Sequence, residues 1–303
     1  MVIAGFAAPL LRRRVPAPPL VTQTVAFAAP VALCVAVRRS RTRDVAVCCL
    51  QMWAYVAAYK TPHDDVRGQA QRVHIRYPIV ADRVLGLGEL PSVRLQRRLA
   101  RVGPDGVPRW TALDRVLVWA HWSWFAVPHG AILYVMFRHP RRFTRAAVLT
   151  YAVFDVGASV YWVLPTAPPW YAATQGEAGE EALAVRRMMV EYGESFWGDG
   201  WGSLYSVFGG NPLAAMPSLH FATSLMAASL LAETGRGPGV FGYGYLVTLG
   251  FALVYLGEHY LVDLLGGAAL TVAVKRIAPF ATEPLRGAAC IVSRLEEMAH
   301  GEA

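Results

Sequence analysis

The apolar residues of this chain are gathered into long runs, and this clustering limits the folds open to it. A helix needs about 20 residues to cross a bilayer. Hydrophobic residues make up 55% of the 303 residues and charged residues 17%, which is less charge than soluble domains usually carry. The sequence therefore predicts an all-α, polytopic membrane helical bundle. Its seven or so transmembrane helices are expected near residues 20–37, 44–59, 111–137, 146–164, 217–232, 240–257 and 260–276.

The segment between the second and third runs has a different composition. Arginine recurs through residues 60–110 among valine, isoleucine and leucine, with breaks at Gly86-Leu87-Gly88 and Pro91. This pattern predicts amphipathic helices in the head-group layer, with a solvated basic loop as an equal alternative. We therefore expect three regions: N-terminal transmembrane helices with an amphipathic interfacial segment (1–110), a catalytic membrane core (111–276) and a cytoplasmic tail (277–303).

The net charge of +8 indicates orientation rather than a nucleic-acid partner. No basic recognition motif is present, and arginine in short loops retains those loops on the cytoplasmic side. In a seven-span protein, the basic turns 38–43 and 138–145, Arg236 and Lys275-Arg276 all fall on that side. The arginines at 12–14 run against this orientation. The sequence still favours a multi-pass protein of the cell membrane whose late histidines, His220 and His259, face the outer leaflet.

Two short stretches carry the residues suited to chemistry. His259 and Asp263 are four residues apart. On a helix, that spacing lets the carboxylate accept a hydrogen bond from one ring nitrogen and leaves the other nitrogen as a nucleophile. A helix that starts at Pro217 and is capped by Ser218 places His220 in its first turn, beside backbone N–H groups that can bind an anion. Together these features indicate phosphoryl transfer at a membrane surface.

These stretches resemble the type 2 phosphatidic acid phosphatase superfamily, which carries a Pro-Ser-Gly-His motif and a later His-x-x-x-Asp motif. The chain departs from that pattern where Leu219 replaces the glycine, where Ala252-Leu253 replaces Ser-Arg, and in lacking the first Lys/Arg-Pro motif. The segment Pro165–Trp170, together with Pro-Ser-Leu-His, is similar to the fungal inositol phosphorylceramide synthases, a branch with Pro-x-x-Pro-Pro-Trp. The resemblance implies a six-helix core of phosphatidic acid phosphatase type.

The resemblance and the spacing together assign roles to individual residues. His259 would attack phosphorus and form a phosphohistidine, Asp263 would orient it, and His220 would act as acid and then as base. No metal or cofactor is implied. The missing cationic motif leaves the phosphoryl charge to be compensated elsewhere. The candidate substrate-binding residues are Ser218 and Leu219 at the helix start, the arginines Arg186, Arg187 and Arg76, and Trp170 as a wall of the site.

Three functions remain open from the sequence. The first is a membrane-embedded lipid phosphotransferase that moves a phosphorylated head group, with phosphoinositol as a candidate, from a donor lipid to an alcohol. The second is a lipid or prenyl phosphate phosphatase, in which water is the acceptor. The third, a transporter or inactive scaffold, is disfavoured because the sequence has no symmetric halves. The expected partners are a phospholipid or prenyl-phosphate substrate and membrane lipids. The oligomeric state stays open.

Overall fold

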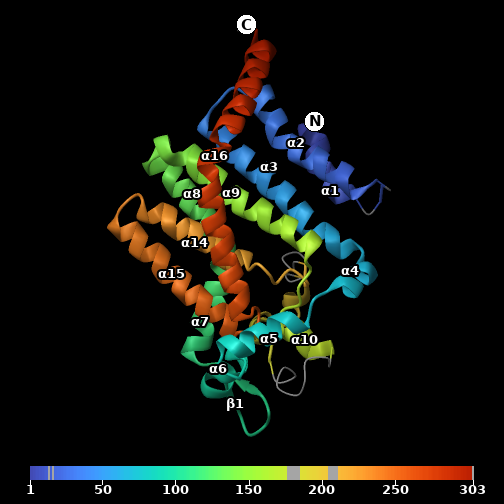
Figure 1. Ribbon diagram of the computed structural model, residues 1–303, viewed down its shortest axis with the longest axis vertical. Coiled ribbons are helices and arrows are strands. Elements are labelled where there is room, and N and C mark those ends of the chain that lie inside the picture. Colours follow the sequence, from blue (N-terminus) through green and yellow to red (C-terminus); the bar gives the residue numbers. More distant parts are fainter. Residues whose placement is uncertain (13, 16, 176–184, 204–210, 302–303) are drawn as a thin grey trace. The chain divides into compact units, whose positions relative to one another are not determined.

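The computed structural model describes residues 1–12, 14–15, 17–175, 185–203 and 211–301. These residues are mostly helical, with one antiparallel pair of short strands, β1 (Arg101–Val102) and β2 (Pro108–Arg109). The predicted all-α membrane fold is confirmed (Figure 1). The chain forms two compact units, Met1–Asp64 with Ala273–Ala303, and Asp65–Val272. The three regions expected from the sequence remain predictions.

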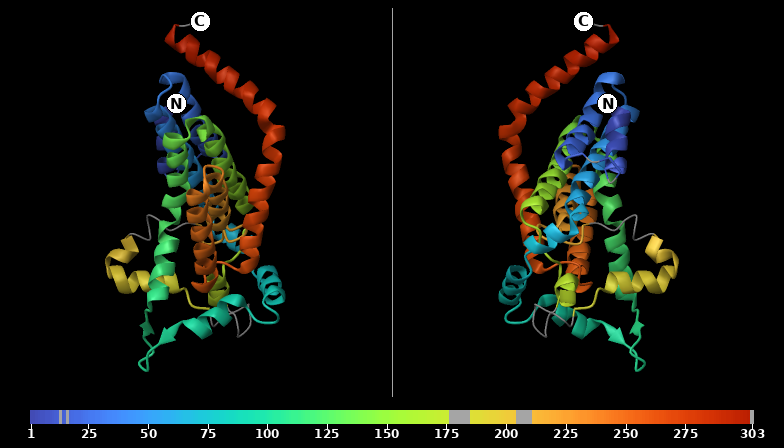
Figure 2. Two further views of the ribbon diagram at one scale, coloured as in Figure 1. Left: turned by 90° about the vertical axis from the view of Figure 1, so that its left-hand side faces the viewer. Right: turned by 90° about the vertical axis from the view of Figure 1, so that its right-hand side faces the viewer.

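In the first unit, α1 (Val2–Leu11), α2 (Pro19–Ala36) and α3 (Arg41–Lys60) pack side by side (Figure 2). Gly5 permits this approach, because a Cβ there would lie 2.4 Å from the Cβ of Ala29. The buried Arg43 donates through Nη1 to Val37 O (2.8 Å) and pairs with Glu296 Oε1 (2.7 Å). That pair joins α3 to the end of α16 (Leu261–His300).

The second unit is built around α14, the helix that follows the Pro-Ser-Leu-His motif. α14 packs against α15, α8 and α9, and buries both small and large side chains along its length. A Cβ on Gly242 of α15 would lie 2.7 Å from Ala228 Cα, so these two backbones are in close contact. The described residues of this unit include the helices α4 (Val66–Arg72), α5 (Arg76–Leu85), α6 (Pro91–Leu99), α7 (Ala112–Trp122), α8 (Ala126–Arg138), α9 (Pro140–Val163), α10 (Pro169–Gln175), α12 (Met188–Trp197), α14 (Leu219–Ala232) and α15 (Arg236–Tyr255), and the first part of α16.

Each predicted apolar run contains helix, with two differences in extent. The run 111–137 is broken by a 3₁₀ turn, Ser123–Phe125, between α7 and α8. The last run continues as α16 to His300, because residues 277–300 are rich in the helix formers alanine, leucine, glutamate and arginine. Among the described residues, three helices are long and apolar enough to cross a membrane, namely α2, α9 and α15. The count of seven spans stays a prediction.

The basic segment 60–110 contains three short α-helices, α4, α5 and α6, of which α5 and α6 lie closest to the site described below. These two each bury apolar and polar side chains together, Ile79 with Asp82 on α5 and Val93 with Gln96 on α6. α5 also leaves Val80 exposed. Helices are present as predicted, but their buried faces carry polar groups that reach the site described below. Their place in the head-group layer stays a prediction.

A small set of backbone hydrogen bonds fixes the chain just before the Pro-Ser-Leu-His motif. Thr166 bridges in parallel to His74 on one side and to Ala214 on the other. His74 N donates to Pro165 O (2.9 Å), and Thr166 N donates to Leu213 O (2.9 Å). The Pro165–Trp170 motif therefore holds the chain leading to the site through its backbone.

Candidate active site

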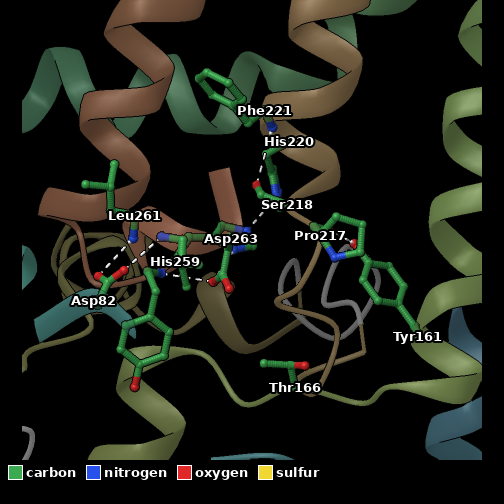
Figure 3. Close-up of polar contacts among 12 residues, drawn as sticks. Asp82, Tyr161, Thr166, Pro217, Ser218, His220, Phe221, His259, Leu261 and Asp263 are labelled. Atoms are coloured by element: carbon green, nitrogen blue, oxygen red, sulfur yellow. Dashed lines mark hydrogen bonds and ion pairs between the residues drawn. The ribbon is translucent and has the colours of Figure 1, made fainter. Parts of the chain in front are cut away.

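Two histidines from distant parts of the sequence meet where α14 and α16 begin (Figure 3). His220 Nδ1 lies 3.2 Å from His259 Nε2, and His259 Nδ1 lies 3.2 Å from Asp263 Oδ2. His259 and Asp263 are both buried, at 4% and 0% exposure. The imidazole of His259 therefore links a carboxylate on one side to a second imidazole on the other, which is the arrangement expected of an oriented nucleophile with an adjacent acid.

The prediction that His259 and Asp263 share a helix face is wrong. His259 lies in the turn before α16, and Asp263 lies in the first turn of that helix. The Asp263 carboxylate reaches back to the helix start, where Oδ2 also accepts a hydrogen bond from Tyr260 N (2.9 Å). A helix N-terminus has free N–H groups that attract such a carboxylate, so the spacing of four still brings the two side chains together.

The start of α14 also differs from the prediction. The helix begins at Leu219, so Pro217 precedes it instead of opening it. Ser218 is the N-cap, and its Oγ accepts from Phe221 N (3.4 Å). Ser218 N donates to Asp263 O (2.9 Å), and the Tyr161 hydroxyl donates to Pro217 O (2.7 Å). These bonds tie the two motifs to each other.

Leu219, which stands where the superfamily motif has glycine, packs against a glycine of a neighbouring helix. The Leu219 side chain is buried at 3% exposure and packs on Gly157 of α9, where an added Cβ would lie 2.3 Å from Leu219 Cδ2. The leucine therefore fills space that a glycine on the neighbouring helix leaves. The substrate-binding role expected for Leu219 stays a prediction, and its side chain is committed to this packing.

Gln96 of α6 fastens the chain just before α12 to the turn that carries His259. Its Nε2 donates to Arg186 O (2.8 Å) and Tyr255 O (2.8 Å), and its Oε1 accepts from Arg186 N (2.9 Å). The turn itself depends on Gly257, which has φ +78°. A Cβ there would lie 2.5 Å from Arg186 O, so the position excludes a side chain on both counts.

We expect Gly257→Ala to lower the free energy of unfolding, by about 1–2 kcal/mol from the left-handed strain alone. Turnover should fall as well, since His259 follows two residues later. Gly244→Ala, on α15 with open space around an added Cβ, is the control: it should leave turnover unchanged and should not lower the free energy of unfolding, because alanine is the better helix former. Thermal midpoints in detergent, measured with turnover, check this. A Gly257→Ala protein with the thermal midpoint and turnover of its parent would show that neither stability nor turnover depends on glycine at this turn.

The three arginines that were expected to bind substrate have different surroundings in the structure. Arg187 Nε lies 3.0 Å from Glu258 Oε1, and its guanidinium lies 3.7 Å above the ring of Trp170. Arg186 pairs instead with Glu191 (Nε–Oε2 3.1 Å). Arg76 is exposed and makes no side-chain hydrogen bond within the described part of the chain. Arg187 and Trp170 are therefore joined to the residue next to His259, whereas Arg186 and Arg76 are not.

Sequence reasoning missed Asp82, a fully buried carboxylate on α5. Its Oδ2 accepts from Leu261 N (2.9 Å) and its Oδ1 from Val262 N (2.8 Å), so it caps the helix that carries Asp263 (Figure 3). Burial raises the pKa of Asp82 to about 6, with a smaller contribution from Asp263, although the two N–H donors act in the opposite direction. No local pattern marks this residue, because its partners lie far along the chain.

The raised pKa of Asp82 predicts a pH-dependent stability. The folded state keeps this proton longer than the unfolded chain, whose carboxyl has an ordinary pKa of 3.8. The contribution of Asp82 is therefore most favourable at low pH and is lost as pH rises through the folded pKa of about 6. We expect the stability of the parent relative to Asp82→Asn to decline between about pH 4 and pH 6.5. Thermal midpoints across this range measure it, and parallel curves would contradict it.

Two aromatic side chains that the sequence did not assign to the site lie against His220. Trp124, from the 3₁₀ turn after α7, has its ring centroid 4.2 Å from that of His220, and Trp124 Nε1 donates to Thr223 Oγ1 (2.9 Å). His121, in the last turn of α7, stacks on His220 at 5.1 Å and 27°. The break between α7 and α8 thus positions the ring of His220. No group of three or more His, Cys, Asp or Glu side chains in the described ranges could hold a metal ion.

The sequence model of the PAP2 superfamily, the type 2 phosphatidic acid phosphatases, matches residues 105–277. This is more than half of the chain and includes both motifs of the site. The chain belongs to the PAP2 superfamily, and the class that its fold and site define is a membrane-embedded phosphotransferase or phosphatase.

A relative within this class is the catalytic subunit aur1 of inositol phosphorylceramide synthase from Schizosaccharomyces pombe. The two sequences are 31% identical over 122 residues, which is 38% of this chain and 28% of the yeast protein. This similarity agrees with the branch suggested by Pro165–Trp170 and Pro-Ser-Leu-His. No solved structure matches the chain.

Proposed function

We propose that the protein is a lipid phosphotransferase that works through a phosphohistidine on His259. The observation that carries the proposal is the continuous contact from Asp263 through His259 to His220. Asp263 accepts the Nδ1 proton of His259, which leaves the Nε2 lone pair directed toward His220. A phosphoryl group that displaces the contact between the two imidazoles meets the nucleophile and the acid together.

The reaction then has two steps. His259 Nε2 forms a bond to phosphorus while the bond from phosphorus to the lipid oxygen breaks, and His220 gives its proton to that oxygen. The neutral His220 next takes the proton of an incoming hydroxyl, whose oxygen attacks phosphorus and releases His259. Donors for the phosphoryl oxygens would come from the Ser218 hydroxyl and from the backbone N–H of Leu219. Arg187, the residue before α12, would add positive charge, which its ion pair with Glu258 partly neutralises.

Two observations favour an alcohol over water as acceptor. His259 is 4% exposed and Asp263 is 0% exposed, so the reacting groups are shielded from bulk water. The yeast relative is named for the synthesis of an inositol phosphorylceramide, which is a transfer product. We extend this to phosphoinositol as the transferred head group and to a long-chain alcohol as the acceptor.

The test follows a labelled phosphoryl group in vesicles that contain the purified protein. Phosphatidylinositol, phosphatidate and a prenyl phosphate would each be offered with and without a long-chain alcohol. Label in a new lipid supports transfer, and the productive donor names the head group. Label recovered only as water-soluble phosphate ester or free phosphate would replace the proposal by a phosphatase. Transport or scaffolding would leave the parent and a His259→Gln variant indistinguishable.

We also propose that the site faces the outer side of the cell membrane, from the basic turns on the opposite side. Asp199 is exposed in the outer segment between α12 and the start of α14. In a variant without the four native cysteines, Asp199→Cys should react with a membrane-impermeant maleimide in intact cells. Reaction only after the cells are opened would place the site on the cytoplasmic side.

A further inference from the structure

Glu258, the residue before His259, is a nearly buried carboxylate to which the mechanism above gives no task of its own. Its Oε1 lies 3.0 Å from Arg187 Nε, and its Oε2 lies 3.3 Å from Arg187 Nη2. Both carboxylate oxygens therefore engage one guanidinium, in the two-point geometry of the stronger arginine–carboxylate pairs. The Glu258 side chain is 9% exposed and that of Arg187 is 22% exposed. Because water covers little of the pair, its charges act over a longer range than surface charges do.

This ion pair is fixed beside the reacting groups. Met188, the residue after the arginine, donates its N–H to Leu256 O (3.1 Å), two residues before the glutamate. Both members of the pair also interact electrostatically with His121, whose ring stacks on that of His220 with centroids 5.1 Å apart. The two charges are therefore felt at the place where a phosphoryl group meets the catalytic histidines.

We propose that Glu258 is a specificity-determining residue, which makes the site reject phosphate groups that carry two negative charges. This inference rests on the proposed function, in which the donor lipid is a phosphodiester, and it adds the residue that excludes phosphomonoesters. Glu258 offsets the positive charge of Arg187, and the carboxylate of Asp263 adds a negative charge behind His259. These charged groups therefore leave no surplus of positive charge for a second negative charge on the ligand.

The two classes of phosphate group differ in the charge that this arrangement opposes. A phosphodiester carries a single negative charge, whereas a phosphomonoester carries about −1.5 to −2 at pH 7. Arg186 does not balance the additional charge, because it pairs with Glu191 (Nε–Oε2 3.1 Å). At an effective dielectric constant of about 20, repulsion between two like charges about 10 Å apart weakens binding roughly tenfold or more. Glu258 therefore disfavours the monoester even without touching it.

The experiment measures kcat/KM in vesicles for phosphatidylinositol and phosphatidate with the same acyl chains and the same long-chain alcohol. The parent should favour phosphatidylinositol. Glu258→Gln keeps the side-chain shape and an oxygen that can accept from Arg187, but it loses the charge. It should raise kcat/KM for phosphatidate relative to phosphatidylinositol by at least about tenfold, because a doubly charged group gains more from the unmasked arginine. Glu258→Asp keeps the charge and should retain the parental ratio.

The matched control is Glu191→Gln, which removes the partner of the neighbouring Arg186 and should keep the parental ratio. Thermal midpoints show which variants are folded, and Glu258→Ser provides a second way to remove the charge. The inference is overturned by a parent that favours phosphatidate, by an unchanged ratio in a folded variant without the Glu258 charge, or by an equal shift in Glu258→Asp or Glu191→Gln. A parent that uses neither donor would overturn the proposed function, and this inference with it.

Discussion

Replacing His259 with glutamine is expected to abolish transfer, with a fall in turnover of at least about 10³-fold, because removal of a nucleophile leaves only binding and charge stabilisation. Glutamine suits the test because its amide can still donate to Asp263 Oδ2, so the buried carboxylate retains a partner. The variant should also lose the acid-labile, alkali-stable label that a phosphohistidine would place on the parent protein. Quenched reactions with a labelled donor measure both quantities.

His129→Gln is the control for this change. It alters a histidine on α8 that contacts neither His220 nor His259 in the described part of the chain. Turnover and labelling should both match the parent. Thermal midpoints of the two variants show whether the proteins are folded. Persistent labelling in a folded His259→Gln protein would assign the nucleophile to another residue, and His220 would be the first to test.

Asp263→Asn is expected to lower turnover by about 10²–10⁴-fold, in line with the loss seen when an orienting carboxylate becomes an amide. In the parent, the single oxygen Oδ2 accepts from both His259 Nδ1 (3.2 Å) and Tyr260 N (2.9 Å), so the amide oxygen of asparagine can take that place. The neutral amide lacks the negative charge that stabilises the positive charge His259 acquires when its Nε2 bonds to phosphorus.

The measurement is the rate at which the phosphohistidine forms in a single turnover. The substitution keeps the volume of a fully buried side chain, so the thermal midpoint should change far less than the rate. Asp82→Asn provides the comparison, since it also alters a buried carboxylate at the start of α16 but does not contact His259. An Asp263→Asn protein within about tenfold of the parent would show that the negative charge of this residue is not needed.

The class of fold and the central residues of the candidate site follow from local patterns in the sequence. Runs of apolar residues long enough for a bilayer leave helices as the stable choice, since backbone groups must be satisfied within each segment. Short spacings near helix starts also predict the pair His259 and Asp263 and the stretch Ser218-Leu219-His220, because residues so close in sequence meet without help from distant parts of the chain. Even there the details differed, since His259 lies before α16 and Pro217 before α14.

Tertiary structure decided which distant side chains complete the site. Asp82 accepts a hydrogen bond from the N–H of Leu261, which lies 179 residues further along the chain. His121 of α7 stacks on His220 of α14. Arg187 pairs with Glu258, whereas Arg186 turns to Glu191, although the two arginines are adjacent in sequence. No periodicity encodes such choices. They follow from close packing and from the need to pair buried polar groups, both of which depend on the folded arrangement of the whole core.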